Sequence, residues 1–140
     1  MKNLSIFVFV LILSGCATYE TAPTDYQLQN ADYGKRPTQE EVKKMVDQIG
    51  HATLKDPFSA KYTYQPPRKA WTYYQYKVWY GYSIEYTVNA KNSWGAYGGF
   101  EPRQFIYNNG MKTPAQYIQY AYDPDAEAEW EKSAEVENKE

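Results

Sequence analysis

The fold is decided by residues 74–88, which read Tyr74-Gln75-Tyr76-Lys77-Val78-Trp79-Tyr80-Gly81-Tyr82-Ser83-Ile84-Glu85-Tyr86-Thr87-Val88. Every even position in this stretch is apolar or aromatic, and the odd positions are mostly polar. Because successive side chains of a strand point to opposite faces, this alternation predicts β-structure with one packed face and one wet face. The stretch exceeds the usual length of a strand, so a bend near Gly81 is expected. The pattern leaves open whether one bent strand or two are formed.

Shorter strand signals lie on both sides of this stretch. Residues 60–65 alternate in the same way and end at two prolines, and residues 100–107 predict a further strand. Asn108-Asn109-Gly110 predicts a tight hairpin, because Asn and Gly tolerate the positive φ angles of such turns. Residues 111–120 are expected to add a last strand, which Pro114 interrupts.

Residues 39–54 are predicted to form the main helix. Thr38 and Glu41 have the spacing of a capping box, in which each side chain binds the other residue's backbone N–H. The residues that recur at helical spacing are Val42, Met45, Val46, Ile49 and Thr53. They form one apolar face. Together with three or four antiparallel strands, the helix predicts a two-layer α+β domain over residues 38–122, with the helix packed on the sheet.

The segments outside this domain have a different composition. Residues 16–37 are rich in Thr, Pro, Asp, Gln and Asn and predict a flexible tether. Residues 123–140 hold eight acidic residues and two lysines, with Trp130 as the one large apolar side chain. This composition predicts an acidic tail that is either helical or disordered. The basic residues of the chain are scattered, which argues against a nucleic-acid surface.

The N-terminus has the organisation of a bacterial export signal. Lys2 precedes an apolar run over residues 4–13, which is about half the length that a membrane-spanning helix needs. Leu13-Ser14-Gly15-Cys16 follows and resembles the lipobox of bacterial lipoproteins, where a peptidase cuts before a lipidated cysteine. Residues 1–15 are therefore expected to be a signal peptide, and Cys16 is expected to be the site of lipid attachment.

The lipid is expected to hold the mature protein on a membrane. Each buried methylene of an acyl chain contributes about 0.8 kcal/mol, so several chains anchor a protein stably. In Gram-negative lipoproteins an aspartate after the cysteine favours retention in the inner membrane, and this chain has Ala17 at that position. The resemblance thus implies the outer membrane. Ala17 does not report which leaflet is used, and we expect the domain to face the periplasm.

Two residue types limit the chemistry that the chain can perform. Cys16 is the only cysteine, and lipidation would consume it, which leaves no thiolate nucleophile and no cysteine metal ligand. His51 is the only histidine. Its place near the helix end favours an interaction with the helix dipole over a role as general base or metal ligand. With no nucleophile elbow, zinc-protease motif or phosphate loop in the sequence, we expect no enzyme activity, no cofactor and no metal site.

Four segments resemble one family of proteins. They are Ala31-Asp32-Tyr33-Gly34, Leu54-Lys55-Asp56-Pro57-Phe58-Ser59-Ala60-Lys61-Tyr62, Val88-Asn89-Ala90-Lys91-Asn92-Ser93-Trp94-Gly95-Ala96-Tyr97-Gly98-Gly99 and Asn109-Gly110. The family is an uncharacterised group of small proteobacterial lipoproteins and periplasmic proteins, and the resemblance covers residues 31–112. The chain departs from it at Gly95-Ala96-Tyr97, where the family usually has Gly-Gly-Tyr, and lacks a cysteine that the family often carries in the preceding strand. The resemblance implies export and one small domain, and it implies no reaction.

The glycine-rich turn after the long strand stretch is the candidate binding site. It offers amides, an ammonium group and aromatic rings, a mixture suited to a polar partner or a glycan. The residues concerned are Asn89, Lys91, Asn92, Ser93, Trp94 and Tyr97. The plainer interpretation is that Asn92 and Ser93 only bind the backbone of their own turn. At least one of Gly95, Gly98 and Gly99 is expected to have a positive φ angle.

Two functions fit these observations. The first is a lipid-anchored, non-catalytic lipoprotein that binds another envelope protein as an accessory subunit. The alternative is a glycan- or peptidoglycan-binding module, which the excess of tyrosine favours, since 16 of the 140 residues are tyrosine. A hydrolase would need His51 beside a carboxylate in a cleft.

Overall fold

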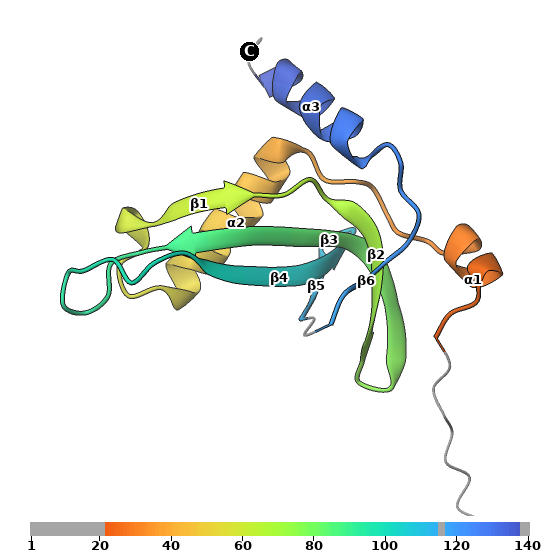
Figure 1. The fold of residues 1–140 in the computed structure, drawn as a ribbon, viewed down its shortest axis with the longest axis horizontal. Helices are drawn as coiled ribbons and strands as arrows, with labels where there is room; N and C mark the ends of the chain where they lie inside the picture. The colour runs from red at the N-terminus through yellow and green to blue at the C-terminus, as the bar shows by residue number, and fades with distance from the viewer. Residues whose placement is uncertain (1–21, 115–116, 138–140) are drawn as a thin grey trace, which may run out of the picture.

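The computed structural model of the protein describes residues 22–114 and 117–137. Its helices and strands, in chain order, are α1 (Asp25–Asn30), α2 (Gln39–Thr53), the 3₁₀-helix η1 (Pro57–Ser59), β1 (Lys61–Tyr64), β2 (Arg68–Tyr74), β3 (Lys77–Asn89), β4 (Glu101–Asn108), β5 (Met111–Pro114), β6 (Gln119–Tyr120) and α3 (Ala126–Glu137). Figure 1 shows α2 lying across one face of a curved sheet, which makes the predicted two-layer α+β arrangement.

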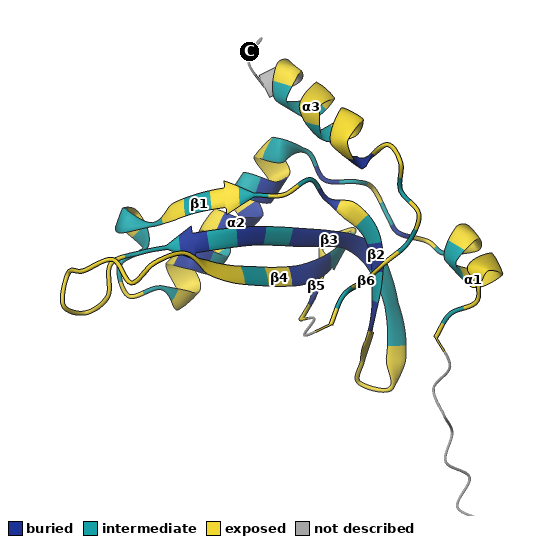
Figure 2. Cartoon of the chain, in the orientation of Figure 1, coloured by how far each residue is buried: buried dark blue, intermediate teal, exposed yellow. Residues whose placement is uncertain are grey.

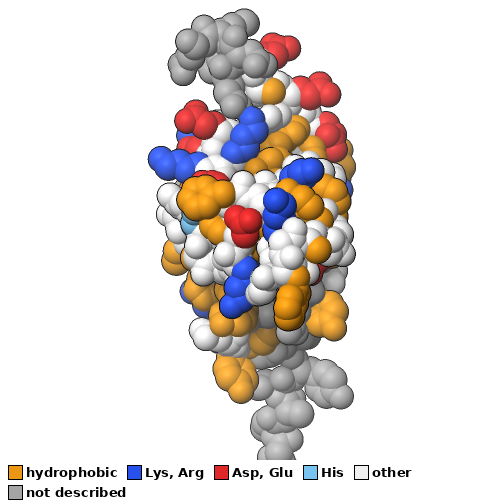
Figure 3. All heavy atoms as spheres, turned by 90° about the vertical axis from the view of Figure 1, so that its left-hand side faces the viewer, with side chains coloured by type: hydrophobic (Ala, Val, Ile, Leu, Met, Phe, Trp, Pro, Cys, Tyr) orange, Lys and Arg blue, Asp and Glu red, His pale blue; other side chains and the backbone are white. Residues whose placement is uncertain are grey.

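All strands of the sheet pair antiparallel, in the order β5-β4-β3-β2-β6. β1 also pairs with β3, beyond the point where β2 leaves it. β3 is therefore the central strand, and it carries the longest run of buried residues in Figure 2. Within the described residues, the sheet has six strands, whereas the sequence predicts three or four. The loop from β3 to β4 lies at the left of Figure 1, the end that faces the viewer in Figure 3.

Residues 74–88, for which the sequence predicts either one bent strand or two, are divided between β2 and β3. Tyr74 closes β2, and Gln75 and Tyr76 form the turn, with φ angles of 50° and 60°. A two-residue hairpin turn with both φ angles positive matches the twist of its strands, but Asn or Gly usually occupies it. The turn therefore had no recognisable signal in the sequence. Residues 77–89 then form one continuous strand, which turns downward at its start in Figure 1 together with β2.

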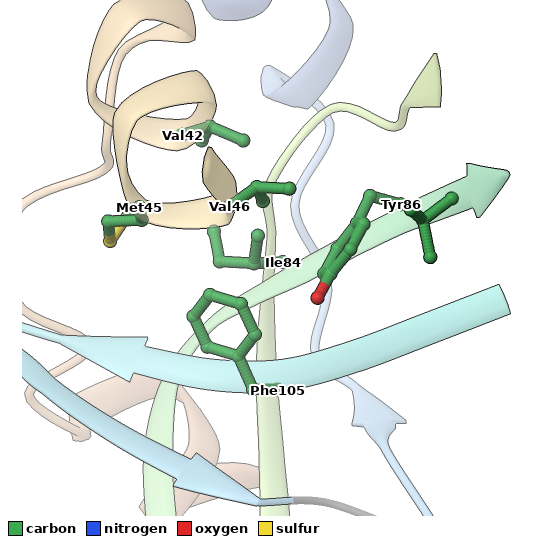
Figure 4. Close-up of a cluster of buried hydrophobic side chains, with 7 residues drawn as sticks. Val42, Met45, Val46, Ile84, Tyr86 and Phe105 are labelled. Atoms are coloured by element: carbon green, nitrogen blue, oxygen red, sulfur yellow. The ribbon is translucent and has the colours of Figure 1, made fainter. Parts of the chain in front are cut away.

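The core lies between α2 and the sheet, where the even face of β3 was predicted to pack. Thr38 and Glu41 form the predicted capping box, with the Glu41 carboxylate accepting from the Thr38 N–H at 2.8 Å. Figure 4 shows side chains of α2 above those of the sheet. The buried cluster is Val42, Met45, Val46, Ile84, Tyr86, Val88 and Phe105. Removing each such aliphatic side chain from water stabilises the fold by about 1.5–3 kcal/mol.

The opposite face of the sheet is also covered in part. Ser83, Ile106 and Thr113 follow one another across β3, β4 and β5 and are almost fully buried. The Thr72 hydroxyl donates to the carbonyl of Tyr117 at 2.9 Å. This bond holds the chain before β6 on the second face. The predicted strand over residues 111–120 is thus two short strands, and they lie at opposite edges of the sheet.

The predicted tether does not hold for residues 25–37. Residues 16–21 lie outside the described residues, but α1 follows them with its own capping box from Thr24 to Gln27. Tyr33 is buried. Arg36 forms an ion pair with Asp123 at 2.6 Å, and only 3% of the Asp123 side chain is exposed. The domain therefore begins before residue 38, because these residues are held by the segment that precedes α3.

Within the predicted acidic tail, residues 126–137 are helical, which is one of the two forms that the sequence predicts. α3 has no fully apolar face, and its contact with the domain is made through few residues. Trp130 packs against the core cluster, and its carbonyl accepts from the Gln39 side-chain amide at 3.2 Å. The single large apolar residue of the tail is thus its anchor, as its composition indicates.

Candidate functional site

The predicted binding turn is an exposed loop over residues 90–100, between β3 and β4. Every residue from Lys91 to Phe100 is exposed. The loop nevertheless has a defined shape. The Asn92 side-chain oxygen accepts from the backbone N–H groups of Trp94 at 2.9 Å and Ala96 at 3.1 Å. Gly95 and Gly99 have φ angles of 76° and 109°, which confirms the expected positive φ in this loop.

A second loop supports this one from the side. Ser59 of η1 accepts from the Lys91 N–H through its hydroxyl at 2.8 Å, and its carbonyl accepts from the Tyr97 hydroxyl at 3.0 Å. The Lys61 ammonium lies 4.8 Å from the centre of the Tyr97 ring, within the range of a cation–π contact. The Asp56 carboxylate caps η1 through the Ser59 N–H. The two loops therefore form one connected end of the molecule.

Aromatic side chains project from this end into solvent. Trp94 is 92% exposed and Phe58 is 89% exposed, and Phe100 and Tyr97 are also counted among the exposed large side chains. We call Phe58, Trp94, Tyr97 and Phe100 the aromatic tip. Figure 3 shows hydrophobic side chains with basic ones between them on this end. Leaving rings of this size in water is unfavourable for an isolated protein, and clusters of them mark interaction surfaces.

The six residues predicted for the site have different roles. Asn89 and Asn92 bind the loop backbone, since the Asn89 side chain accepts from the Gly99 N–H at 3.2 Å. The plainer interpretation of Asn92 is thus confirmed. Lys91 uses its backbone N–H for Ser59, and its ammonium lies 5.8 Å from the Tyr97 ring centre. Trp94 presents its ring to solvent, and Ser93 is exposed beside it.

Sequence reasoning missed Phe58 and Phe100. Phe58 follows Asp56-Pro57, a pair that ends the preceding helix and starts a turn. An aromatic residue inside such a turn has no strand or helix face to pack on. That placement was a signal for an exposed ring, and it could have added Phe58 to the predicted site.

His51 lies next to the aromatic tip, at the end of α2. Its ring is 5.2 Å from the ring of Phe58, edge to face, and its Nε2 is 3.6 Å from the Asp47 carboxylate one helical turn earlier. The side chain is 46% exposed, so this pair lies on the open surface of α2. Within residues 22–114 and 117–137, no group of three or more His, Cys, Asp and Glu side chains is placed to hold a metal ion.

The tyrosines near the core are not exposed binding groups. Burial raises the pKa of Tyr62, Tyr64 and Tyr86 above the ordinary value of a phenol. The neutral phenol is thus the favoured form where these rings pack. The excess of tyrosine thus serves the packed face of β1 and β3 as well as the surface.

Comparisons with protein-family models, curated proteins and solved structures gave no significant match to this chain. The family resemblance that the sequence indicates stays a prediction. The expected signal peptide over residues 1–15 and the lipid attachment site at Cys16 lie outside the described residues. In the part of the chain that the structure covers, every helix is too short or too polar to cross a membrane.

Proposed function

We propose that this protein is a lipid-anchored lipoprotein of the outer membrane that binds another envelope protein as a non-catalytic accessory subunit. The aromatic tip carries this proposal. It combines large apolar rings with a frame of hydrogen bonds from two loops, and the sequence supplies the anchor through Cys16. The domain would face the periplasm.

The aromatic tip has the properties of the few residues that dominate a protein interface. Trp and Tyr are the side chains that most often contribute such binding energy. Binding also requires that side chains and loops lose freedom, and a loop ordered beforehand loses less. Asn92, Ser59 and Gly95 fix the loop before any partner arrives. Ordering of the backbone therefore takes little from the binding free energy that Trp94 and Phe58 would contribute.

The position of the aromatic tip also fits an anchored subunit. In Figure 1, α1 lies at the right of the domain and the loop over residues 90–100 at the left. The chain leads from α1 back toward Cys16. A lipid at Cys16 would therefore hold the protein near α1 and leave the aromatic tip directed away from that attachment.

Photocrosslinking from the aromatic tip tests this proposal. With p-benzoylphenylalanine in place of Trp94 in living cells, we expect one covalent adduct of defined mass. Tyr76 is the matched control position, because it is 94% exposed on the β2–β3 turn and lies outside the aromatic tip. The same probe at Tyr76 should give no such adduct. Identical adducts from both positions, or none from position 94 in correctly anchored protein, would contradict the proposal.

Trp94→Ala separates binding from folding. The ring contacts little of the domain, so the melting temperature should change by no more than about 2 °C, as for other surface substitutions. Capture of the crosslinked partner should fall at least tenfold. A large loss of stability would instead mean that the ring is part of the fold.

The anchor has its own test. In Cys16→Ser the hydroxyl cannot form the thioether to the lipid, so we expect an unprocessed precursor that migrates more slowly than the mature protein. Metabolic labelling with palmitate checks the assignment directly. Ala17→Ser is the control, since it keeps the thiol and should be labelled normally. Label on the Cys16→Ser protein would refute lipid attachment at this cysteine.

A further inference from the structure

A groove whose lining shares no residue with the aromatic tip lies beside the sheet, and one end of it reaches the chain around β6. One part has a volume of about 640 Å³ and is lined by Trp71, Thr72, Tyr73, Tyr74, Gln104, Pro114, Tyr117 and Gln119. A neighbouring part of about 870 Å³ shares Gln104 and Pro114 with it. Cavities of some 300–1,000 Å³ are typical of sites for small ligands. The groove is thus large enough for more than one ring of a chain ligand.

Aromatic residues line the smaller part of the groove. Tyr73 and Tyr74 are about one-third exposed, and Tyr117 is 80% exposed. The bond from the Thr72 hydroxyl to the Tyr117 carbonyl fixes the backbone of Tyr117 against β2. Gln119, in β6, adds a side-chain amide on an exposed edge. This part therefore offers aromatic rings and a neutral hydrogen-bonding group together.

The larger part of the groove combines apolar side chains such as Ile49 and Pro102 with polar ones such as Gln65 and Lys112. Glu85 and Gln104 are paired across β3 and β4, on the face opposite to Ile84 and Phe105. The Tyr120 hydroxyl donates to the Glu85 carboxylate. The Arg68 guanidinium lies 4.0 Å from the centre of the Tyr120 ring. Glu85 and Gln104 thus bring polar groups to this part of the groove, where they can bind hydroxyl and amide groups of a ligand.

We propose that this groove binds an oligosaccharide of N-acetylated pyranose sugars. A pyranose ring has an apolar C–H face and a rim of hydroxyl groups, which matches aromatic rings beside side-chain amides. The acetamido group adds a methyl for the aromatic part and an N–H and C=O for the amides of Gln104 and Gln119. A purely apolar ligand would cover the polar side chains of Glu85, Gln104 and Gln119 without offering them further hydrogen bonds, which is unfavourable. This site is separate from the aromatic tip and does not rest on the function proposed for it.

Titration of the full mature domain with the β-1,4-linked tetramer of N-acetylglucosamine tests the proposal by NMR. We expect chemical-shift changes at the indole N–H of Trp71 and at the side-chain amides of Gln104 and Gln119. Trp94, in the aromatic tip, serves as the internal control and should not move. The same tetramer of glucose, which lacks the acetamido groups, should bind at least tenfold more weakly.

Two exposed tyrosines give a matched pair of variants. Tyr117→Ala removes a ring that lines the groove, and the affinity for the tetramer should fall about tenfold. Tyr122→Ala removes an 89% exposed ring that does not line either part of the groove, and the affinity should stay within twofold. Both variants should keep the spectrum of the folded domain, because both rings are largely in water.

Several outcomes would overturn the proposal. One is the absence of shifts at Trp71, Gln104 and Gln119 when the tetramer is present at about ten times the dissociation constant of a weak site, which is about 1 mM. Another is a set of shifts confined to Trp94, which would place the sugar at the aromatic tip. A protein that crosslinks to a photoreactive residue at position 117 would also overturn the proposal, because the groove would then bind a protein and not a glycan. Trp94→Ala should leave sugar binding intact. Failure of the sugar-binding proposal can therefore be distinguished from failure of the proposed accessory function.

Discussion

Gly81→Ala should unfold most of the protein at temperatures where the natural chain is stable. A Cβ atom at this position would lie 2.4 Å from the backbone oxygen of Tyr107 and 2.7 Å from Cγ2 of Ile106. The obstructing oxygen belongs to β4, which is paired with β3 and cannot retreat without breaking the sheet. Overpacking of this kind costs about 3 kcal/mol. In a domain of this size, the melting temperature should fall by more than about 10 °C.

Gly98→Ala is the control for that experiment. Gly98 has no atom within 4 Å of an added Cβ, and its φ angle is not among the positive ones. Its melting temperature should stay within about 2 °C of the natural chain, as for ordinary surface changes. Thermal unfolding followed by circular dichroism checks both variants. Equal stability of Gly81→Ala and Gly98→Ala would mean that β3 and β4 are not packed as closely as described.

Asp123→Ala should destabilise the protein at least as much as Gly81→Ala. The carboxylate accepts from Arg36 at 2.6 Å and from the Lys69 backbone N–H at 2.7 Å, and it is nearly excluded from water. Without it, the Arg36 guanidinium stays in a largely buried place with no countercharge from this residue. Breaking one side of a buried pair costs about 3–5 kcal/mol. Urea unfolding should show this loss as a lower midpoint with an unchanged slope.

An exposed ion pair gives the comparison for Asp123. Glu101 lies 3.6 Å from Arg103, with 74% of its side chain exposed. Exposed pairs contribute about 0–1 kcal/mol, so Glu101→Ala should hardly change the midpoint. The double variant Arg36→Met with Asp123→Leu should recover part of the stability that Asp123→Ala loses, because no buried charge is then left alone. A midpoint for Asp123→Ala equal to that of Glu101→Ala would show that the pair is open to water.

The sequence predicted those parts of the fold in which local pattern and tertiary packing agree. The helix over residues 39–54 and its cap at Thr38 were predictable because the apolar face and the capping pair are both local. The same holds for the hairpin at Asn109-Gly110, where both residues have positive φ angles. The turn at Gln75 and Tyr76 was not predictable, because neither residue type favours that conformation.

The remaining differences come from contacts between distant residues. Residues 25–37 look like a tether by composition, and only the burial of Tyr33 and the pairing of Arg36 with Asp123 make them part of the domain. No local pattern reports such a pairing. The same limit applies to the groove, which needs β2, β4 and the chain around β6 at one place. The loop over residues 90–100 could be chosen from sequence, since its glycines and its aromatic residues are adjacent in the chain.

The contact between Arg36 and Asp123 also determines when this protein can finish folding. The two residues are 87 positions apart, and the bond from Gln39 to Trp130 spans 91. Chains whose contacts join distant positions fold slowly, because long loops must close first. During synthesis, Arg36 and Gln39 emerge well before Asp123 and Trp130, the residues to which they bind. The acidic segment that contains Asp123 and Trp130 therefore completes a structure that the preceding residues can only begin.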